Sequence, residues 1–315
     1  MNIVFMGTPD FAVPSLEALL KAEYRVVGVV TQPDRPKGRK KTMTPPPVKL
    51  VAERHGLPVL QPERLRAPEA VEALAALQPD LIVTAAYGQI LPKAVLDMPR
   101  YGCLNVHASL LPRYRGAAPI QYAIMSGDAI TGVTIMYMAE GLDTGDMISS
   151  VTAPIGADDD AGSMFAALSE AGARLLIDTL PKLLAGELQA EPQKEEEATY
   201  AKMLRRGDER IDWSRSSRDI ANQVRGLRPA PGAFTQWHGE TLKVWRCAPL
   251  DAARPSAAPG EVVGADAAGV DVCTGDGVLR ITELQPAGKK AMSAAELVNG
   301  GKLAVGVMLG EGSMT

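Results

Sequence analysis

Apolar and polar positions follow two different patterns along the chain. In the first half, short and almost wholly apolar runs alternate with stretches in which apolar residues recur every three or four positions. Buried parallel strands give runs of the first kind, and helices with one buried face give the second. We expect strands at residues 3–6, 25–30, 80–84, 104–107 and 133–137, and helices at 10–22, 48–55, 68–77, 120–126 and 162–184. Strands that alternate with helices form βαβ units, so an α/β domain with a Rossmann-like, mainly parallel sheet is predicted.

The second half has only short strand patterns, separated by turns that contain glycine or aspartate. They lie at residues 234–237, 241–245, 262–265, 269–273 and 278–284, and His238-Gly239 is a tight hairpin between the first two. Strands of this length and spacing predict a C-terminal OB-like β-barrel domain. The polar run at residues 191–197 is expected to be an exposed linker. The predicted organisation is a domain at residues 1–187, a linker at 188–206 and a barrel at 207–315.

Composition excludes several classes of protein. The three cysteines include no Cys-x-x-Cys pair and the three histidines no His-x-x-x-His pair, so neither a disulfide framework nor a metal site is expected. No apolar run is long enough for a membrane span, and a cytoplasmic protein is expected. The net charge is −4, and residues 205–315 carry 14 basic and 13 acidic side chains. A nucleic-acid surface would therefore have to be a local patch.

Two polar side chains mark the end of one predicted strand. Asn105 and His107 are two positions apart, so they point to the same face of the strand. Ligands of open α/β sheets gather at the carboxyl ends of the strands. A satisfied histidine at a capped strand end is the simpler interpretation of His107 alone. The first βα turn has only Gly7 where a dinucleotide motif needs three glycines, so a bound dinucleotide is not expected.

Five segments together carry a resemblance to a known family. Asn105-x-His107 followed by Ser109-Leu110-Leu111-Pro112 resembles the signature of the folate-dependent formyltransferases, and residues 138–146 resemble the family's block with its catalytic aspartate. Residues 5–12, 31–36 and 284–292 resemble the branch that acts on methionine charged on initiator tRNA. The resemblance implies transfer of a formyl group from 10-formyltetrahydrofolate, a co-substrate, to the α-amino group of that methionine, for translation initiation.

Formyl transfer to an amine needs a donor aimed at the oxyanion and a route for a proton. Asn105 is the expected donor and His107 the expected acid–base group. The resemblance makes Asp143 the carboxylate that orients His107. Taken alone, Asp143 beside glycines is more typical of a turn. With Asn105 and His107, we expect it to be catalytic.

The resemblance also indicates where the two substrates bind. Folate is expected along Ser109, Leu110, Leu111 and Pro112 and along the loop with Tyr87, Gly88, Ile90 and Leu91. Backbone groups between apolar walls suit a flat pteridine, although apolar loops packed on a sheet give the same pattern. tRNA is expected at the basic segment Arg35, Lys37, Arg39, Lys40 and Lys41, with Arg225, Arg228, Lys289 and Lys290 as weaker candidates.

Three functions remain open at this stage. The first is the tRNA-dependent formyltransferase, expected to be a monomer without a tightly bound cofactor. The second is a transformylase with a small acceptor, whose catalytic residues would look the same. The third is a tRNA-binding protein without activity. The presence of Asn105, His107 and Asp143 argues against this third function. The basic segment and the predicted barrel favour tRNA over a small acceptor, although such a basic run is often only a solvated surface.

Overall fold

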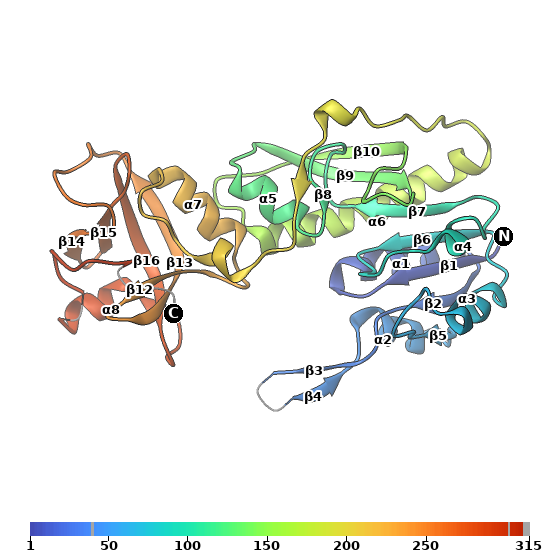
Figure 1. Cartoon of the computed structure of the whole chain (residues 1–315), viewed down its shortest axis with the longest axis horizontal. Coiled ribbons are helices and arrows are strands. Elements are labelled where there is room, and N and C mark those ends of the chain that lie inside the picture. Colours follow the sequence, from blue (N-terminus) through green and yellow to red (C-terminus); the bar gives the residue numbers. More distant parts are fainter. Residues whose placement is uncertain (39–40, 302, 311–315) are drawn as a thin grey trace. The chain divides into compact units, whose positions relative to one another are not determined.

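The computed structural model describes residues 1–38, 41–301 and 303–310 (Figure 1). These residues form two compact units. The first contains Met1–Pro119, Ile130–Pro154 and Phe165–Ala201, and the second contains Ile120–Ala129, Ile155–Met164 and Lys202–Thr315.

The first unit is built on a seven-stranded sheet with the strand order β10-β9-β7-β6-β1-β2-β5. Its strands are β1 (Ile3–Gly7), β2 (Val26–Val30), β5 (Val59–Leu60), β6 (Leu81–Ala85), β7 (Cys103–His107), β9 (Ile130–Tyr137) and β10 (Met147–Pro154). The five strands β5, β2, β1, β6 and β7 are parallel to one another. The strand β9 is antiparallel to both of its neighbours, β7 and β10. The predicted Rossmann-like, mainly parallel sheet is therefore confirmed.

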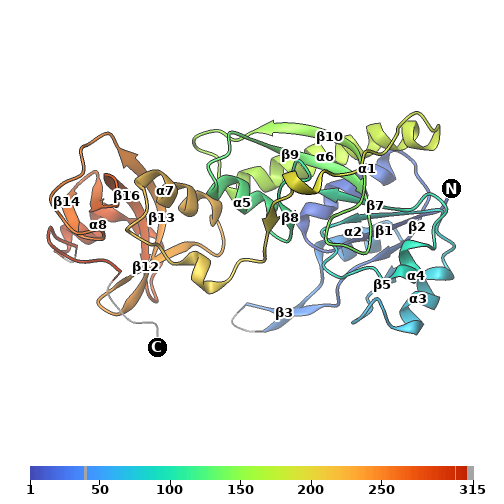
Figure 2. The same ribbon diagram turned by 45° about the horizontal axis from the view of Figure 1, so that its top comes forward.

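Helices flank this sheet (Figure 2). They are α1 (Val13–Lys21), α2 (Pro47–Arg54), α3 (Pro68–Ala75), α4 (Lys93–Leu96) and the part of α6 (Ala161–Leu184) from Phe165 on, with short 3-10 turns at Asp10–Ala12 and Glu195–Glu197. The helix α5 (Pro119–Met125) belongs from Ile120 on to the second unit. Leu74 of α3 and Val95 of α4 share one core cluster with Val4, Ile82 and Cys103 of the sheet. Gly172 of α6 instead lies against Val106 and Val133, and an added Cβ there would come within 2.7 Å of Val106. Cys103 and Val106 of β7 thus point to opposite faces of the sheet.

Two small pairs of strands lie outside the main sheet. The hairpin β3 (Arg35–Lys37) and β4 (Thr42–Thr44) extends from the first unit (Figure 1), and β8 (Arg115–Gly116) pairs in parallel with β11 (Tyr200–Ala201). The chain from Glu191 to Ala201 therefore lies on the first unit, because Glu191 also pairs with Met147. Most side chains of the run 191–197 are exposed, and Gln193 is half-buried.

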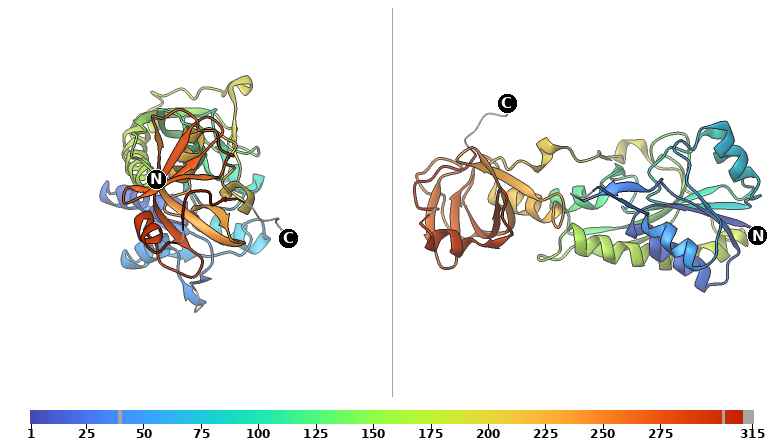
Figure 3. Two further views of the ribbon diagram at one scale, coloured as in Figure 1. Left: turned by 90° about the vertical axis from the view of Figure 1, so that its left-hand side faces the viewer. Right: turned by 90° about the horizontal axis from the view of Figure 1, so that it is seen from below.

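The second unit is an antiparallel β domain with the strand order β12-β13-β16-β15-β14, to which β17 adds beside β16. Its elements are a 3-10 turn at Arg206–Glu209, α7 (Ser217–Gly226), β12 (Ala233–Trp237), β13 (Glu240–Leu250), β14 (Val262–Asp266), β15 (Gly269–Cys273), β16 (Val278–Pro286), β17 (Met292–Ser293) and α8 (Ala294–Asn299). His238 and Gly239 both have positive φ and form the predicted tight hairpin. The sheet curls around one apolar core (Figure 3), and β12 and β14 share no ladder within the described residues.

Candidate active site

The site begins where β7 ends, at the carboxyl edge of the parallel strands. Asn105 and His107 continue the face of Cys103, as their spacing predicts. On the neighbouring strand, the Thr84 hydroxyl lies 2.9 Å from Oδ1 of Asn105. Within residues 1–38, 41–301 and 303–310, no hydrogen bond engages Nδ2 of Asn105. With Oδ1 beside Thr84, the N–H groups of Asn105 are available as donors.

His107 is buried, with 5% of its surface exposed. Its Nε2 lies 3.0 Å from the carbonyl oxygen of Tyr114. A carbonyl can only accept, so this contact places a proton on Nε2. The Nδ1 atom faces Asp143 and lies 3.7 Å from its Oδ2. The structure thus brings together the histidine and the carboxylate, which are 36 residues apart in sequence.

Asp143 lies in the left-handed region, with φ of 50°. A residue with a Cβ rarely adopts this conformation, so surrounding contacts have to hold it. One of them is the backbone N–H of Gly116, which donates to Oδ2 at 2.8 Å. A second constraint is Gly145, where an added Cβ would overlap the Tyr137 carbonyl oxygen. The loop is therefore pressed against the end of β9 with its carboxylate turned to His107.

The sequence did not indicate two side chains that hold the Asp143 loop, Gln193 and Arg115. Gln193 donates through Nε2 to the carbonyls of Asp143, at 2.8 Å, and Gly145, at 2.7 Å. Its Oε1 accepts from Nε of Arg115 at 2.9 Å. Arg115 is 1% exposed, and its Nη1 donates to Glu195 at 2.8 Å. Burial alone would lower the pKa of Arg115, but the hydrogen bonds of Glu195 and Tyr200 raise it above its ordinary value.

The expected folate segment at Ser109–Pro112 is a closed turn. Thr134 of β9 donates to the Ser109 carbonyl at 2.7 Å and accepts from the Leu111 N–H at 3.2 Å. The Ser109 hydroxyl donates to the Arg113 carbonyl at 2.6 Å. Ser109, Leu111 and Pro112 are buried, and Leu110 is half-buried. Most of this block therefore forms the buried turn that follows β7. Leu110 is the residue of the block with the most exposed surface.

The second expected folate segment divides in the same way. Tyr87 and Leu91 belong to the core, whereas Gly88 and Ile90 are exposed, Ile90 by 84%. The Tyr87 carbonyl accepts from the Thr8 hydroxyl at 2.8 Å. Gln89, in the same segment, accepts from the Leu65 N–H at 2.7 Å and donates to the Pro62 carbonyl at 3.0 Å. Gly88 and Ile90 are the members that a ligand can reach.

Comparison with known proteins agrees with this geometry. Residues 1–180 match the family model for formyl transferase, and residues 203–302 match that for the formyl transferase C-terminal domain. The chain is 55% identical to the methionyl-tRNA formyltransferase of Bacillus subtilis, over 98% of both chains. The chain belongs to the methionyl-tRNA formyltransferase family.

Solved structures with lower identity share the fold of this formyltransferase. The sugar 3N-formyltransferase WlaRD, crystallised with dTDP and 5-N-formyl-THF, has a TM-score of 0.66 at 17% identity, over 92% of this chain and 99% of its own. HypX from Aquifex aeolicus, in complex with tetrahydrofolic acid, has a TM-score of 0.62 at 21% identity, over 94% of this chain. This chain spans about half of HypX, 46% of its length.

Part of the basic segment lies on the short antiparallel hairpin that β3 forms with β4. Arg35 and Lys37 lie on β3, and Arg35 forms an exposed ion pair with Glu63 at 2.9 Å. Lys37 and Lys41 are exposed, and no ion pair involves either of them in the described part of the chain. Arg39 and Lys40 lie outside the described residues.

The weaker tRNA candidates of the second unit differ from one another. Arg225 donates to the carbonyls of Gly156 and Asp159 at 3.0 and 2.8 Å, and burial lowers its pKa. Arg228 forms an ion pair with Asp160 at 2.6 Å. These two guanidinium groups thus hold the unit together internally. Lys289 and Lys290 are exposed.

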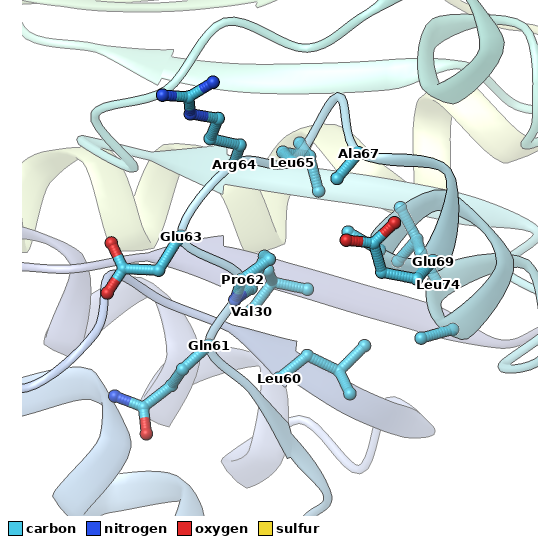
Figure 4. Close-up of a pocket in the computed structure, with 12 residues that line it drawn as sticks. Val30, Leu60, Gln61, Pro62, Glu63, Arg64, Leu65, Ala67, Glu69 and Leu74 are labelled. Atoms are coloured by element: carbon cyan, nitrogen blue, oxygen red, sulfur yellow. The ribbon is translucent and has the colours of Figure 1, made fainter.

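Other possible sites lack reactive groups. Burial raises the pKa of the Cys103 thiol to about 12, so this cysteine packs as an apolar residue. Among the described residues, no cluster could hold a metal ion, and no helix is long and apolar enough to cross a membrane. A cavity of about 430 Å³ lies between β5 and α3, with Leu60, Leu65 and Leu74 in its wall and Glu63 at its edge (Figure 4). Its lining contains none of the predicted site residues.

Proposed function

We propose that this enzyme transfers the formyl group of 10-formyltetrahydrofolate to the α-amino group of methionine on initiator tRNA. The observation that carries the proposal is the His107–Asp143 pair at the end of β7. It stands in a chain that is 55% identical, nearly end to end, to a methionyl-tRNA formyltransferase. The product is N-formylmethionyl-tRNA, and the folate is a co-substrate that leaves after each turnover.

In this mechanism the amine nitrogen attacks the formyl carbon, and the carbonyl electron pair moves to oxygen. The N–H of Asn105 donates to that oxyanion, because Oδ1 lies beside Thr84 and Nδ2 has no other hydrogen-bond partner in the described residues. The carbon–nitrogen bond to the folate then breaks, and the folate nitrogen gains a proton as the acceptor amine loses one.

His107 carries that proton in the proposal. Its Nε2–H is held by the Tyr114 carbonyl, so Nδ1 is the nitrogen that can accept. Asp143 lies at ion-pair distance from Nδ1 and stabilises the imidazolium formed there. Because Gly116 also donates to Asp143, the carboxylate stays in place as the charge on His107 changes.

We place the folate against Leu110, Gly88 and Ile90, the accessible members of the two predicted segments. Leu111, Pro112, Tyr87 and Leu91 support these contacts from the core, and Ser109 closes its turn through Arg113.

We place the acceptor end of the tRNA on the β3–β4 hairpin, where Arg35, Lys37 and Lys41 supply positive charge together with Arg39 and Lys40. Phosphate contacts of this kind position a nucleic acid without reading its sequence. The antiparallel β domain supplies a second tRNA surface that includes Lys289 and Lys290. We retain residues 1–187 as the catalytic domain, 188–206 as the linker and 207–315 as the tRNA-binding domain, in a cytoplasmic monomer.

A direct assay tests the function. The protein is incubated with 10-formyltetrahydrofolate and with charged initiator tRNA, free methionine or a small sugar amine in separate reactions. Formylated methionyl-tRNA should form far faster than either small product. Faster formylation of the sugar amine would replace the proposal with a transformylase of small acceptors, and no product in any reaction would contradict a catalytic function.

A further inference from the structure

We infer that Gln193 is a positioning residue that sets the distance between Asp143 and His107. This inference rests on the proposed function, because it assigns Gln193 a role at the same site. Gln193 lies 50 residues beyond Asp143, in the segment that follows α6.

The hydrogen bonds of Gln193 use its whole amide group. Both hydrogens of Nε2 are directed at carbonyls of the catalytic loop, those of Asp143 and Gly145. Its Oε1 accepts from Arg115. A reversed amide would set Oε1 against two carbonyls and Nε2 against a guanidinium N–H, so this orientation is fixed. Gln193 therefore acts as a clamp with one geometry.

The clamp is anchored to a buried charge. Arg115 is 1% exposed, and a buried guanidinium needs a partner, which Glu195 provides at 2.8 Å. The segment is fixed on both sides of Gln193, because Tyr200 and Ala201 pair with Arg115 and Gly116 and Glu191 pairs with Met147. Arg115 thus cannot shift without leaving its charge buried and unpaired.

The short strand β8, which contains Arg115 and Gly116, helps to hold both the carboxylate and the backbone of Asp143. Gly116 donates to the carboxylate, and Gln193, held by Arg115, donates to the backbone carbonyl. Asp143 has φ of 50°, a strained conformation for a residue with a Cβ, which relaxes when its constraints are removed. Loss of the clamp should therefore let Asp143 move away from Nδ1 of His107, which is 3.7 Å away.

The first test is kinetic. Gln193→Ala should lower kcat roughly 10- to 100-fold, the effect of a misplaced catalytic group, with little change in KM for folate or tRNA. Gln193→Glu, which has the same shape but lacks both donors, should do the same. In an Asp143→Asn background the Gln193 substitution should add almost nothing, because the group it positions no longer acts. Equal losses in both backgrounds would overturn the inference.

The second test is independent of activity. The chain has only three histidines, His55, His107 and His238, so their imidazole nitrogens can be followed by NMR after 15N-histidine labelling. Gln193→Ala should move the His107 signals in the same direction as Asp143→Asn does. The signals of the other two histidines should stay unchanged, which shows that the fold is intact. His107 signals like those of the wild type would overturn the inference.

Lys194→Ala is the matched control. Lys194 is the next residue, is exposed, and pairs with Glu197 instead of with the Asp143 loop. It should leave both kcat and the His107 signals unchanged. If the wild type failed to formylate charged initiator tRNA, the proposed function would be wrong, but the NMR comparison would still decide whether Gln193 positions Asp143.

Discussion

The Asp143 loop and the β3–β4 hairpin are both polar connections of the first unit, but they are held very differently. The carboxylate of Asp143 accepts from the Gly116 N–H, its backbone carbonyl accepts from Gln193, and both donors are distant in sequence. On the hairpin, Lys37 and Lys41 are exposed and form no ion pair within the described residues. A group that acts on reacting atoms needs a fixed position, whereas a group that meets a large polyanion gains its energy on binding.

The largest effect that this comparison predicts is at the fixed loop. His107→Ala and Asp143→Asn should each lower kcat by about 10²- to 10⁴-fold, the range for loss of acid–base catalysis, with the fold unchanged. Single-turnover formylation of charged initiator tRNA measures the rate, and circular dichroism measures the fold. Asp146→Asn, at an exposed aspartate three residues away, is the control and should be close to wild type. Equal losses at Asp143 and Asp146 would remove the distinction between a positioned and an ordinary loop carboxylate.

The next effect concerns the hairpin. Replacing Lys37, Arg39 and Lys41 together with alanine should weaken tRNA use and flatten its dependence on salt, by about one unit of log–log slope for each tRNA phosphate that is no longer neutralised. KM for folate should not change. Initial rates at several salt concentrations measure the slope. Lys21→Ala, at an exposed lysine of α1, should keep the wild-type slope. An unchanged slope in the triple variant would mean that the hairpin is only a solvated surface.

The same difference explains what the sequence could predict. The strands of β1, β2, β6, β7 and β9 are apolar runs, so their positions are visible without the structure. The edge strand β10 was missed because its alternate side chains are exposed and include Ser150 and Thr152, which interrupt an apolar pattern. Basic residues of the hairpin carry no hydrophobic period, and their strand pairing was missed for the same reason.

At the site, the sequence identified the groups expected to react but not the groups that hold them. Asn105, His107 and Asp143 lie in recognisable motifs. Gln193 and Thr134 lie in segments whose composition is ordinary for a loop and a strand, and their role depends on hydrogen bonds that span 48 to 50 and 23 to 25 residues. Residue types in a segment do not specify such long-range hydrogen bonds, so only the folded chain shows them.

Thr134 allows the turn at residues 109–112 to be tested through the free energy of unfolding instead of the rate of catalysis. Thr134 is 1% exposed, and its hydroxyl donates to the Ser109 carbonyl and accepts from the Leu111 N–H. Thr134→Val keeps the shape but leaves two buried backbone groups unpaired, and the free energy of unfolding should fall by about 2 kcal/mol or more. Urea denaturation measures it. Thr131→Val, at a buried threonine of the same strand, is the control and should change stability much less. Similar losses at both positions would show that the turn does not depend on Thr134.

The smallest expected effect is at Tyr87, whose backbone carbonyl accepts a hydrogen bond from Thr8 while its hydroxyl forms none within the described residues. Tyr87 is 4% exposed, and its Oη has no hydrogen-bond partner within the described residues. Burial raises the pKa of Tyr87 to about 12. Tyr87→Phe removes a desolvated polar atom without breaking a hydrogen bond, so the free energy of unfolding at pH 7 should stay equal or rise by up to about 1 kcal/mol.

The pH dependence of stability makes this prediction sharper. Above about pH 10 the tyrosine ionises in the unfolded chain but stays neutral in the native one, so the unfolded state binds fewer protons and wild-type stability falls as the pH rises towards 12. Tyr87→Phe lacks this contribution, and its advantage over wild type should therefore be larger at pH 11 than at pH 7. Burial also raises the pKa of Cys103 to about 12, but this thiol is present in both proteins and cancels in the difference. Urea denaturation at the two pH values gives the measurement. A clear loss of stability in the variant at pH 7 would mean that the Tyr87 hydroxyl has a partner in solution, and that this loop is held by its side chain as well as by its backbone.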